Sequence, residues 1–163
     1  MKKNNYLIFA HYHSNGLIRD DILEFLRKSN TFFKKIIFIS TNLKINQIKK
    51  FPKSVKIIRR KNIGYDFYSY KCGLEYYLKK LKKNYSNENL FFLNSSVLFI
   101  KKNRFINEIK KIKISENKFW GLTKSYELTE HIQSYFFCFS SKILSNKRIF
   151  KWWKDIRPFK KRQ

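Results

Sequence analysis

The stretch "SVKIIRRKNIGYDFYSYKCGL", from Ser54 to Leu74, carries the pattern that decides the fold. Its opening run, up to Arg60, is typical of a strand, and the apolar spacing from Phe67 onward is typical of a helix. Between them, Gly64 permits a tight turn and Asp66 is well placed to cap the helix. The stretch therefore predicts a strand, a turn and a helix, which is the repeating unit of α/β proteins.

The same alternation continues on both sides of this stretch. Strands are predicted at 5–13, 34–40, 88–100, 118–125 and 132–141, helices at 17–29, 104–112 and 147–156, and a short helix or loop at 42–51. Continuous apolar strands that alternate with helices predict an α/β fold of Rossmann type, with a mostly parallel sheet and helices on both faces. The length of 163 residues suits one domain, 1–163.

The chain carries a formal net charge of +26, which raises the question of a nucleic-acid or membrane partner. Lys far outnumbers Arg, and Ile, Asn, Phe and Tyr are abundant, a composition typical of an AT-rich genome. No nucleic-acid-binding module is recognisable, and a specific nucleic acid is not expected. No signal peptide or membrane-spanning run is found, so we expect a cytoplasmic protein, with peripheral contact to the anionic inner face of the membrane left open.

Polar clusters follow several of the predicted strands. They are His11–His13, Ser40–Asn42, Arg59–Asp66 and Asn94–Ser96. Ligands of such sheets bind at the carboxyl ends of the strands, so these clusters predict a common site. Arg59 and Arg60 beside a helix start would form an anion pocket suited to phosphates. The alternative is that Asp66 serves only as a helix cap.

A metal site finds little support in the sequence. Hard divalent cations prefer carboxylate oxygens, and the chain contains no Asp-x-Asp motif. Mg²⁺ or Mn²⁺ therefore stays an open possibility without a ligand set. His11 and His13 face the same side of an extended chain, but no third ligand is in view. The stretch Asn94-Ser95-Ser96 is equally compatible with a simple turn.

Two later segments have a functional and a structural interpretation. Glu127, Glu130 and His131 lie in a connection between apolar strands, and each is a candidate general base or substrate-orienting group. The alternative is that they are solvated loop residues. In "RIFKWWKDIRPFKKRQ", basic and aromatic residues interleave as in a membrane-contacting segment. We favour the alternative that the Trp pair docks this helix on the core.

Three stretches together resemble the rhamnan synthesis protein F family of bacterial polysaccharide glycosyltransferases. They are "RRKNIGYDFYSYKCGL", "LFFLNSSV" and "FWGLTKSYELTEHIQSYFFCFS", and "IFAHYH" near the start fits as well. The resemblance implies a GT-A-like fold and transfer of a sugar from a nucleoside-diphosphate donor. It also implies a glycan or lipid-linked glycan acceptor for a cell-surface polysaccharide or lipopolysaccharide, often extended with rhamnose.

The resemblance also implies roles for particular residues. Its motifs contain Asn62, Gly64, Asp66, Ser69 and Lys71, then Asn94 and Ser96, then Trp120, Gly121, His131, Gln133, Ser134 and Tyr135. With the polar clusters, this predicts a donor site of His11, Arg59, Arg60, Asn62, Gly64, Asp66, Lys71, Asn94, Ser95 and Ser96. The predicted catalytic residues are His131, Glu130 and Glu127, and the predicted acceptor-side residues are Trp120, Gln133 and Ser134.

The chain departs from the family pattern at two places. Ser95 stands where the family commonly has Asp, which removes a carboxylate from the predicted donor site. This favours an alternative function, a catalytically degenerate glycosyltransferase fold that acts as a binding module. Family members usually continue with helical sequence beyond the region of Trp153, so the chain is interpreted as a fragment, a minimal version or a degenerate version, truncated at its C-terminus relative to the family.

Overall fold

The computed structural model describes residues 4–81, 88–112, 114, 119–127 and 129–158. A six-stranded sheet, in the order β3-β2-β1-β4-β8-β5, forms its centre. Four strands are parallel, namely β1 (Asn5–His11), β2 (Lys35–Ser40), β3 (Val55–Arg59) and β4 (Asn89–Asn94). The strands β8 (Phe136–Ser140) and β5 (Phe119–Gly121) add an antiparallel edge. The predicted α/β class with a mostly parallel sheet is confirmed.

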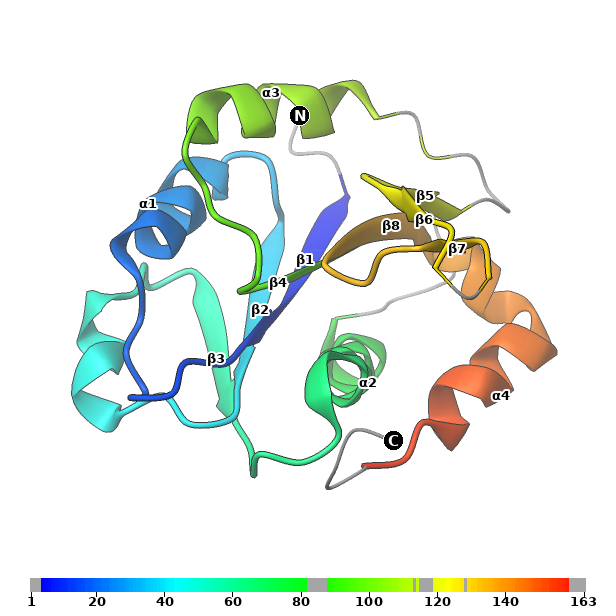
Figure 1. Ribbon diagram of the computed structural model, residues 1–163, viewed down its shortest axis with the longest axis horizontal. Coiled ribbons are helices and arrows are strands. Elements are labelled where there is room, and N and C mark those ends of the chain that lie inside the picture. Colours follow the sequence, from blue (N-terminus) through cyan, green and yellow to red (C-terminus); the bar gives the residue numbers. More distant parts are fainter. Residues whose placement is uncertain (1–3, 82–87, 113, 115–118, 128, 159–163) are drawn as a thin grey trace.

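Helices cover both faces of the sheet (Figure 1). On one face lie α1 (Asp20–Ser29) and α3 (Lys102–Lys111), and on the other lie α2 (Tyr65–Lys80) and α4 (Lys147–Asp155). Two short 3-10 helices, η1 (Ile45–Lys50) and η2 (Ser141–Ser145), complete the helical elements of the described residues. None of the helices in these residues combines the length and apolar character needed to cross a bilayer.

Each face of the sheet has its own apolar core, because both sides of the central strands are buried. Leu7, Phe9, Phe38 and Phe91 point towards α1 and α3, while Tyr6, Ile8, Ile37 and Phe92 point towards α2 and α4. Continuous burial is expected for parallel strands with helices on both faces. It explains why these strands read as unbroken apolar runs instead of alternating ones.

Several predicted strands are wrong in extent. The strand predicted at 5–13 ends at His11, and of the strand predicted at 132–141 only Phe136–Ser140 forms β8. The strand predicted at 88–100 ends at Asn94, because the Asn94 side chain accepts a hydrogen bond from the Ser96 N–H at 3.0 Å and turns the chain. The strand predicted at 118–125 is split between β5 and β6 (Lys124–Ser125). The second piece pairs with β7 (His131–Ile132) in a separate two-stranded sheet.

The strand order places a crossing point at the centre of the sheet. From β1 the chain proceeds outward through β2 to β3, and it then returns to the other side of β1 to form β4. The connections that leave the neighbouring strands β1 and β4 therefore run towards opposite edges of the sheet. In open α/β sheets the crevice at such a point, outside the carboxyl ends of the strands, is where ligands bind.

Candidate functional site

A polar pocket of about 460 Å³ opens at this crossing point. Residues that follow all four parallel strands contribute to it, together with the first turns of α2. Its lining consists of His11, Tyr12, Thr41, Asn62, Tyr65, Asp66, Ser69, Ser95 and Ser96. The structure thus brings together side chains from the four polar clusters that the sequence places at strand ends.

Asp66 lines the pocket and is hydrogen-bonded to Asn94, which is not itself a lining residue. The Asn94 amide nitrogen donates to the Asp66 carboxylate at 2.6 Å, and Asn94 itself is buried. This bond fixes one carboxylate oxygen in a defined direction. The interpretation of Asp66 as a helix cap is wrong, since the N-cap of α2 is Gly64 and Asp66 lies within the first turn. There the helix dipole stabilises its negative charge.

Ser95 joins the loops that follow β1 and β4. Its hydroxyl accepts a hydrogen bond from the Tyr12 N–H and donates one to the Tyr12 carbonyl, both at 3.1 Å. Its own N–H donates to the Ala10 carbonyl at 3.0 Å. Ser95 therefore holds the rim of the pocket in shape at the position where the resemblance predicts a carboxylate.

A resident metal ion does not fit the described residues. No group of three His, Cys, Asp or Glu side chains gathers anywhere among them. In the pocket lining, Asp66 is the one carboxylate, and it is already bonded to the Asn94 amide. Hard divalent cations prefer several carboxylate oxygens, so this lining does not supply a cage for one.

His11 is a buried residue of the pocket lining. Its Nδ1 lies 2.9 Å from the Ser40 hydroxyl, and its ring is 2% exposed. Burial, reinforced by the nearby His13, lowers the pKa of His11 to about 4. The imidazole is therefore neutral at physiological pH, and it can position neighbouring groups without carrying charge.

Arg60 was predicted to bind a diphosphate, but the structure commits its guanidinium to the protein. It donates to the carbonyls of Lys61 at 2.8 Å, Ile63, and Tyr65 at 2.8 Å. It also donates to the Ser69 hydroxyl from Nε at 3.1 Å and from Nη2 at 2.7 Å. All five N–H groups of the side chain are thereby used. Arg60 shapes the loop that enters α2 and has no N–H left for a ligand.

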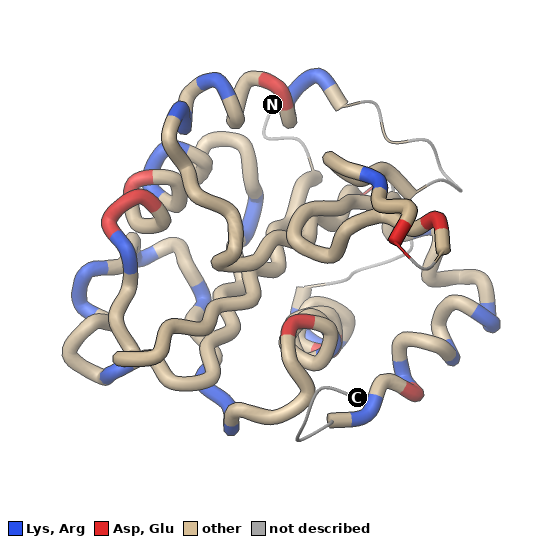
Figure 2. The backbone as a smooth tube through the Cα atoms, viewed as in Figure 1, with Lys and Arg blue, Asp and Glu red and all other residues tan. Residues whose placement is uncertain are grey.

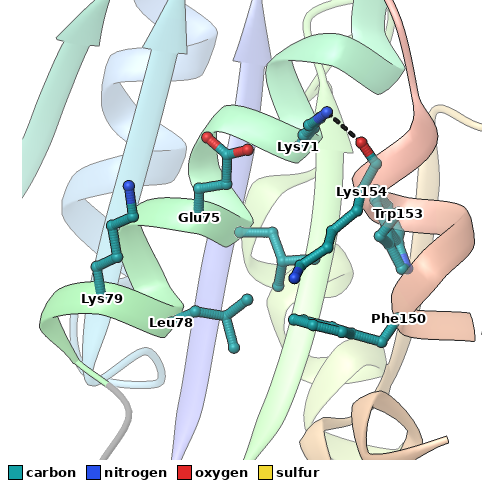
Figure 3. Close-up of a pocket in the computed structure, with 8 residues that line it drawn as sticks. Lys71, Glu75, Leu78, Lys79, Phe150, Trp153 and Lys154 are labelled. Atoms are coloured by element: carbon teal, nitrogen blue, oxygen red, sulfur yellow. Dashed lines mark hydrogen bonds between the residues drawn. The ribbon is translucent and has the colours of Figure 1, made fainter. Parts of the chain in front are cut away.

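The other two predicted cations also lie outside the pocket lining. Arg59 is exposed at the end of β3, and its guanidinium makes no hydrogen bond or ion pair to the described part of the chain. Lys71 points away towards α4, where its ammonium donates to the Lys154 carbonyl (Figure 3). It also donates to the Ile156 carbonyl at 2.9 Å. The predicted pocket of converging cations is therefore wrong, and the lining that is described is neutral apart from Asp66.

The three predicted catalytic residues gather on the β6–β7 hairpin and its turn. Glu127, Glu130 and His131 are all exposed. Glu130 forms an ion pair with Lys124, and Nδ1 of His131 lies 2.8 Å from the Thr129 carbonyl. None of the three lines the polar pocket. The structure thus separates these residues from the donor-side cluster.

The predicted acceptor-side residues are divided between different surroundings. Trp120 packs against Phe136, with ring centroids 5.8 Å apart, in the core below α1 and α3. The backbone of Gln133 donates to the Thr123 carbonyl at 3.1 Å. The Ser134 carbonyl accepts from the Tyr70 hydroxyl at 2.8 Å on the opposite face. The three do not share one site.

Some lining residues lie outside the predicted set. Tyr12 and Thr41 belong to polar clusters that follow strands, so a broader reading of those clusters would have included them. Tyr65 has no local sequence signal for its conformation, a left-handed backbone with φ of 48°. Such a φ is uncommon for a residue other than glycine, and it becomes visible only in the folded chain.

The fold and pocket define the chain as an α/β protein with a polar pocket at the carboxyl edge of a mostly parallel sheet. A family model described as rhamnan synthesis protein F matches residues 36–163, and the chain belongs to this family. A "Virulence protein VirA" of Vibrio anguillarum is 39% identical over 83 residues, covering 51% of this chain and 25% of that protein. Protein y4gN of Sinorhizobium fredii is 34% identical over 105 residues, covering 61% of this chain and 26% of that protein.

These relatives are much longer than this chain, which spans about a quarter of their length. Among solved structures, the chain is similar to the glycosyltransferase GlyE of Streptococcus pneumoniae TIGR4. The TM-score is 0.46 at 15% identity, and the match covers 91% of this chain and 36% of GlyE. A second structure of GlyE gives a TM-score of 0.45 at 13% identity.

Proposed function

We propose that this chain is the donor-binding part of a glycosyltransferase that acts in the synthesis of a cell-surface polysaccharide or lipopolysaccharide. The donor would be a nucleoside-diphosphate sugar, with rhamnose as the first candidate because the family description names rhamnan synthesis. The observation that carries the proposal is the polar pocket at the crossing point of the sheet, in which the Asp66 carboxylate is held by the Asn94 amide.

Asp66 is the group best suited to recognise the donor. A carboxylate accepts hydrogen bonds from hydroxyl groups, and both the ribose and the sugar of the donor present several. The Asn94 amide holds the carboxylate in one orientation, so less freedom is lost on binding. Ser69, Ser95 and Ser96 add small hydroxyl groups to the same lining.

Negative charge on the diphosphate would be offset without direct contact to a cation. The positive end of the α2 dipole faces the pocket, since Tyr65 and Asp66 open that helix and line the cavity. Lys and Arg are spread along most elements of the chain and give it a net charge of +26 (Figure 2). Arg59 would contribute at longer range, and this attraction would weaken as salt is added.

A catalytic role for the hairpin residues would require a movement of the hairpin towards the pocket. Glu127, Glu130 or His131 would have to approach the pocket to deprotonate an acceptor hydroxyl, because none lines it. We therefore assign donor binding to the pocket first.

We further propose a cytoplasmic site of action, where the basic surface would hold the protein near anionic lipids that carry the acceptor glycan.

Thermal unfolding with a panel of nucleoside-diphosphate sugars tests donor binding. A donor present at one hundred times its Kd stabilises the native protein by about 2.7 kcal/mol, so its melting temperature rises clearly. Asp66→Asn should abolish this rise. Glu75→Gln, on the same helix but outside the pocket lining, is the matched control and should keep it. A panel without any rise, or an equal rise in Asp66→Asn, would contradict the proposal.

A second candidate function is a binding module that holds the donor or a glycan without turnover. It is favoured by Ser95, which stands where the resemblance predicts a carboxylate, and by the separation of Glu127, Glu130 and His131 from the pocket lining. An assay of sugar transfer and donor hydrolysis separates the two functions. Donor binding without either reaction would favour the binding module.

A further inference from the structure

The two adjacent tryptophans of α4 have different surroundings. Trp153 is 2% exposed and stacks on Phe92, with ring centroids 5.4 Å apart, so it docks the helix on the sheet. Trp152 remains 53% exposed. The predicted docking function therefore holds for Trp153 alone, and the exposed indole of Trp152 calls for another explanation.

Trp152 and Phe67 form an aromatic corner between α4 and α2. Their ring centroids lie 6.0 Å apart at an interplanar angle of 86°, and Phe67 is 39% exposed. A cleft of about 390 Å³ lies beside this corner, and Tyr65, Asp155 and Arg157 also line it. A smaller hollow of about 150 Å³ adjoins the same corner, and the same two rings line it together with Ile132 and Ser134.

Tyr65 connects this cleft to the donor pocket, because it lines both. It is 50% exposed, and its left-handed φ of 48° is strained for a tyrosine. The Arg60 guanidinium holds it there by donating to its carbonyl at 2.8 Å. Strained residues that the surrounding structure holds in place cluster at ligand sites.

The lining of the cleft suits a saccharide. Aromatic rings pack against the C–H faces of a sugar ring, while charged groups bind its hydroxyls. Asp155 lies three residues after Trp152 on α4, so both project from the same side of that helix. Its carboxylate makes no hydrogen bond or ion pair within the described residues, and Arg157 adds five donors.

We propose that the cleft between Tyr65, Phe67, Trp152 and Asp155 binds a saccharide unit of the acceptor glycan, with Trp152 as its platform. This inference rests on the proposed glycosyltransferase function. The hollow at Ile132 and Ser134 continues the surface and leaves room for the next unit of the glycan. The acceptor would then meet the donor at Tyr65, where the two cavities adjoin.

Saturation-transfer NMR with neutral trisaccharides of rhamnose, glucose and mannose tests the cleft. At least one trisaccharide should bind the wild-type protein, and Trp152→Ala should weaken its Kd about tenfold, as expected for loss of an aromatic platform. Trp152→Phe should retain part of the affinity, and Asp155→Asn should weaken it severalfold. Tyr126→Ala removes an aromatic that is 72% exposed on the hairpin and should leave the affinity unchanged. Circular dichroism checks that each variant is folded.

The outcomes separate this inference from the proposed function. Donor-induced stabilisation without binding of any trisaccharide would overturn the acceptor cleft and leave donor binding intact. Equal affinities in Trp152→Ala and Tyr126→Ala would overturn it as well. Trp152-dependent binding to phosphatidylglycerol vesicles, with no trisaccharide bound, would assign the exposed ring to the membrane instead. Absence of both donor and trisaccharide binding would refute the proposed function itself.

Discussion

Replacing Arg60 with alanine is predicted to destabilise the loop that shapes the donor pocket. In the variant, the exposed carbonyls of Lys61 and Tyr65 can bond to water at little cost. The Ile63 carbonyl and the Ser69 hydroxyl are partly buried, so they lose partners that water replaces less well. At about 1 kcal/mol for each of these two groups, the free energy of unfolding should fall by about 2 kcal/mol.

Urea and thermal unfolding followed by circular dichroism measure this loss. For a protein of this size, about 2 kcal/mol corresponds to a decrease of about 4–8 °C in melting temperature. Arg59→Ala removes the neighbouring, exposed guanidinium and should change stability by less than about 0.5 kcal/mol. Arg60→Lys keeps the positive charge without the planar guanidinium, so its stability should lie between those of Arg59→Ala and Arg60→Ala. Equal stabilities for Arg59→Ala and Arg60→Ala would show that the hydrogen bonds of Arg60 do not stabilise the loop.

The same substitution should also weaken donor binding. Asn62 and Tyr65 line the pocket and belong to the loop that Arg60 holds, so its release would leave them without a fixed position. We expect the donor-induced rise in melting temperature to shrink in Arg60→Ala at equal donor concentration. In Arg59→Ala the rise should persist and become less sensitive to salt, because only a long-range attraction is removed.

Three further predictions concern single residues near the pocket. His11 has a pKa of about 4 in the folded state against 6.5 in the unfolded chain. The stability that comes from keeping His11 neutral should therefore be fully present above pH 6.5. The free energy of unfolding should fall by up to about 3 kcal/mol as the pH decreases to 4. His11→Gln should flatten that part of the pH profile, whereas the exposed His131→Gln should not; equal profiles would contradict the burial argument. Ser95→Asp supplies the carboxylate typical of the family and should create a rise in melting temperature with Mn²⁺; a similar rise in the wild-type protein would argue against this. Gly64→Ala should cost about 2 kcal/mol in unfolding experiments, because φ is 74° and the new Cβ would lie 2.6 Å from the Tyr68 Cβ. An unchanged denaturation midpoint would show that the loop relaxes freely.

Much of the fold follows from local patterns. Strands such as 34–40 contain an uninterrupted apolar run, and α2 follows from apolar spacing after a glycine turn, so element type could be predicted along most of the chain. Because parallel strands bring their carboxyl ends to one edge, the sequence also predicts that Asp66 and Asn94 lie close together. The two residues are 28 positions apart in the sequence, and the order of the strands in the sheet brings them together.

The partner of each side chain could not be predicted in this way. Lys71 donates to a carbonyl 85 positions away, and Ser95 bonds to Tyr12 across 83 positions. Arg59 and Arg60 are adjacent and chemically alike, yet one is exposed and the other is enclosed by its own loop. Periodicity and turn chemistry act over a few residues, so the sequence by itself determined the elements and the edge at which a ligand would bind. Only the tertiary structure decided which polar groups face the pocket, because that depends on which distant segments compete for their hydrogen bonds.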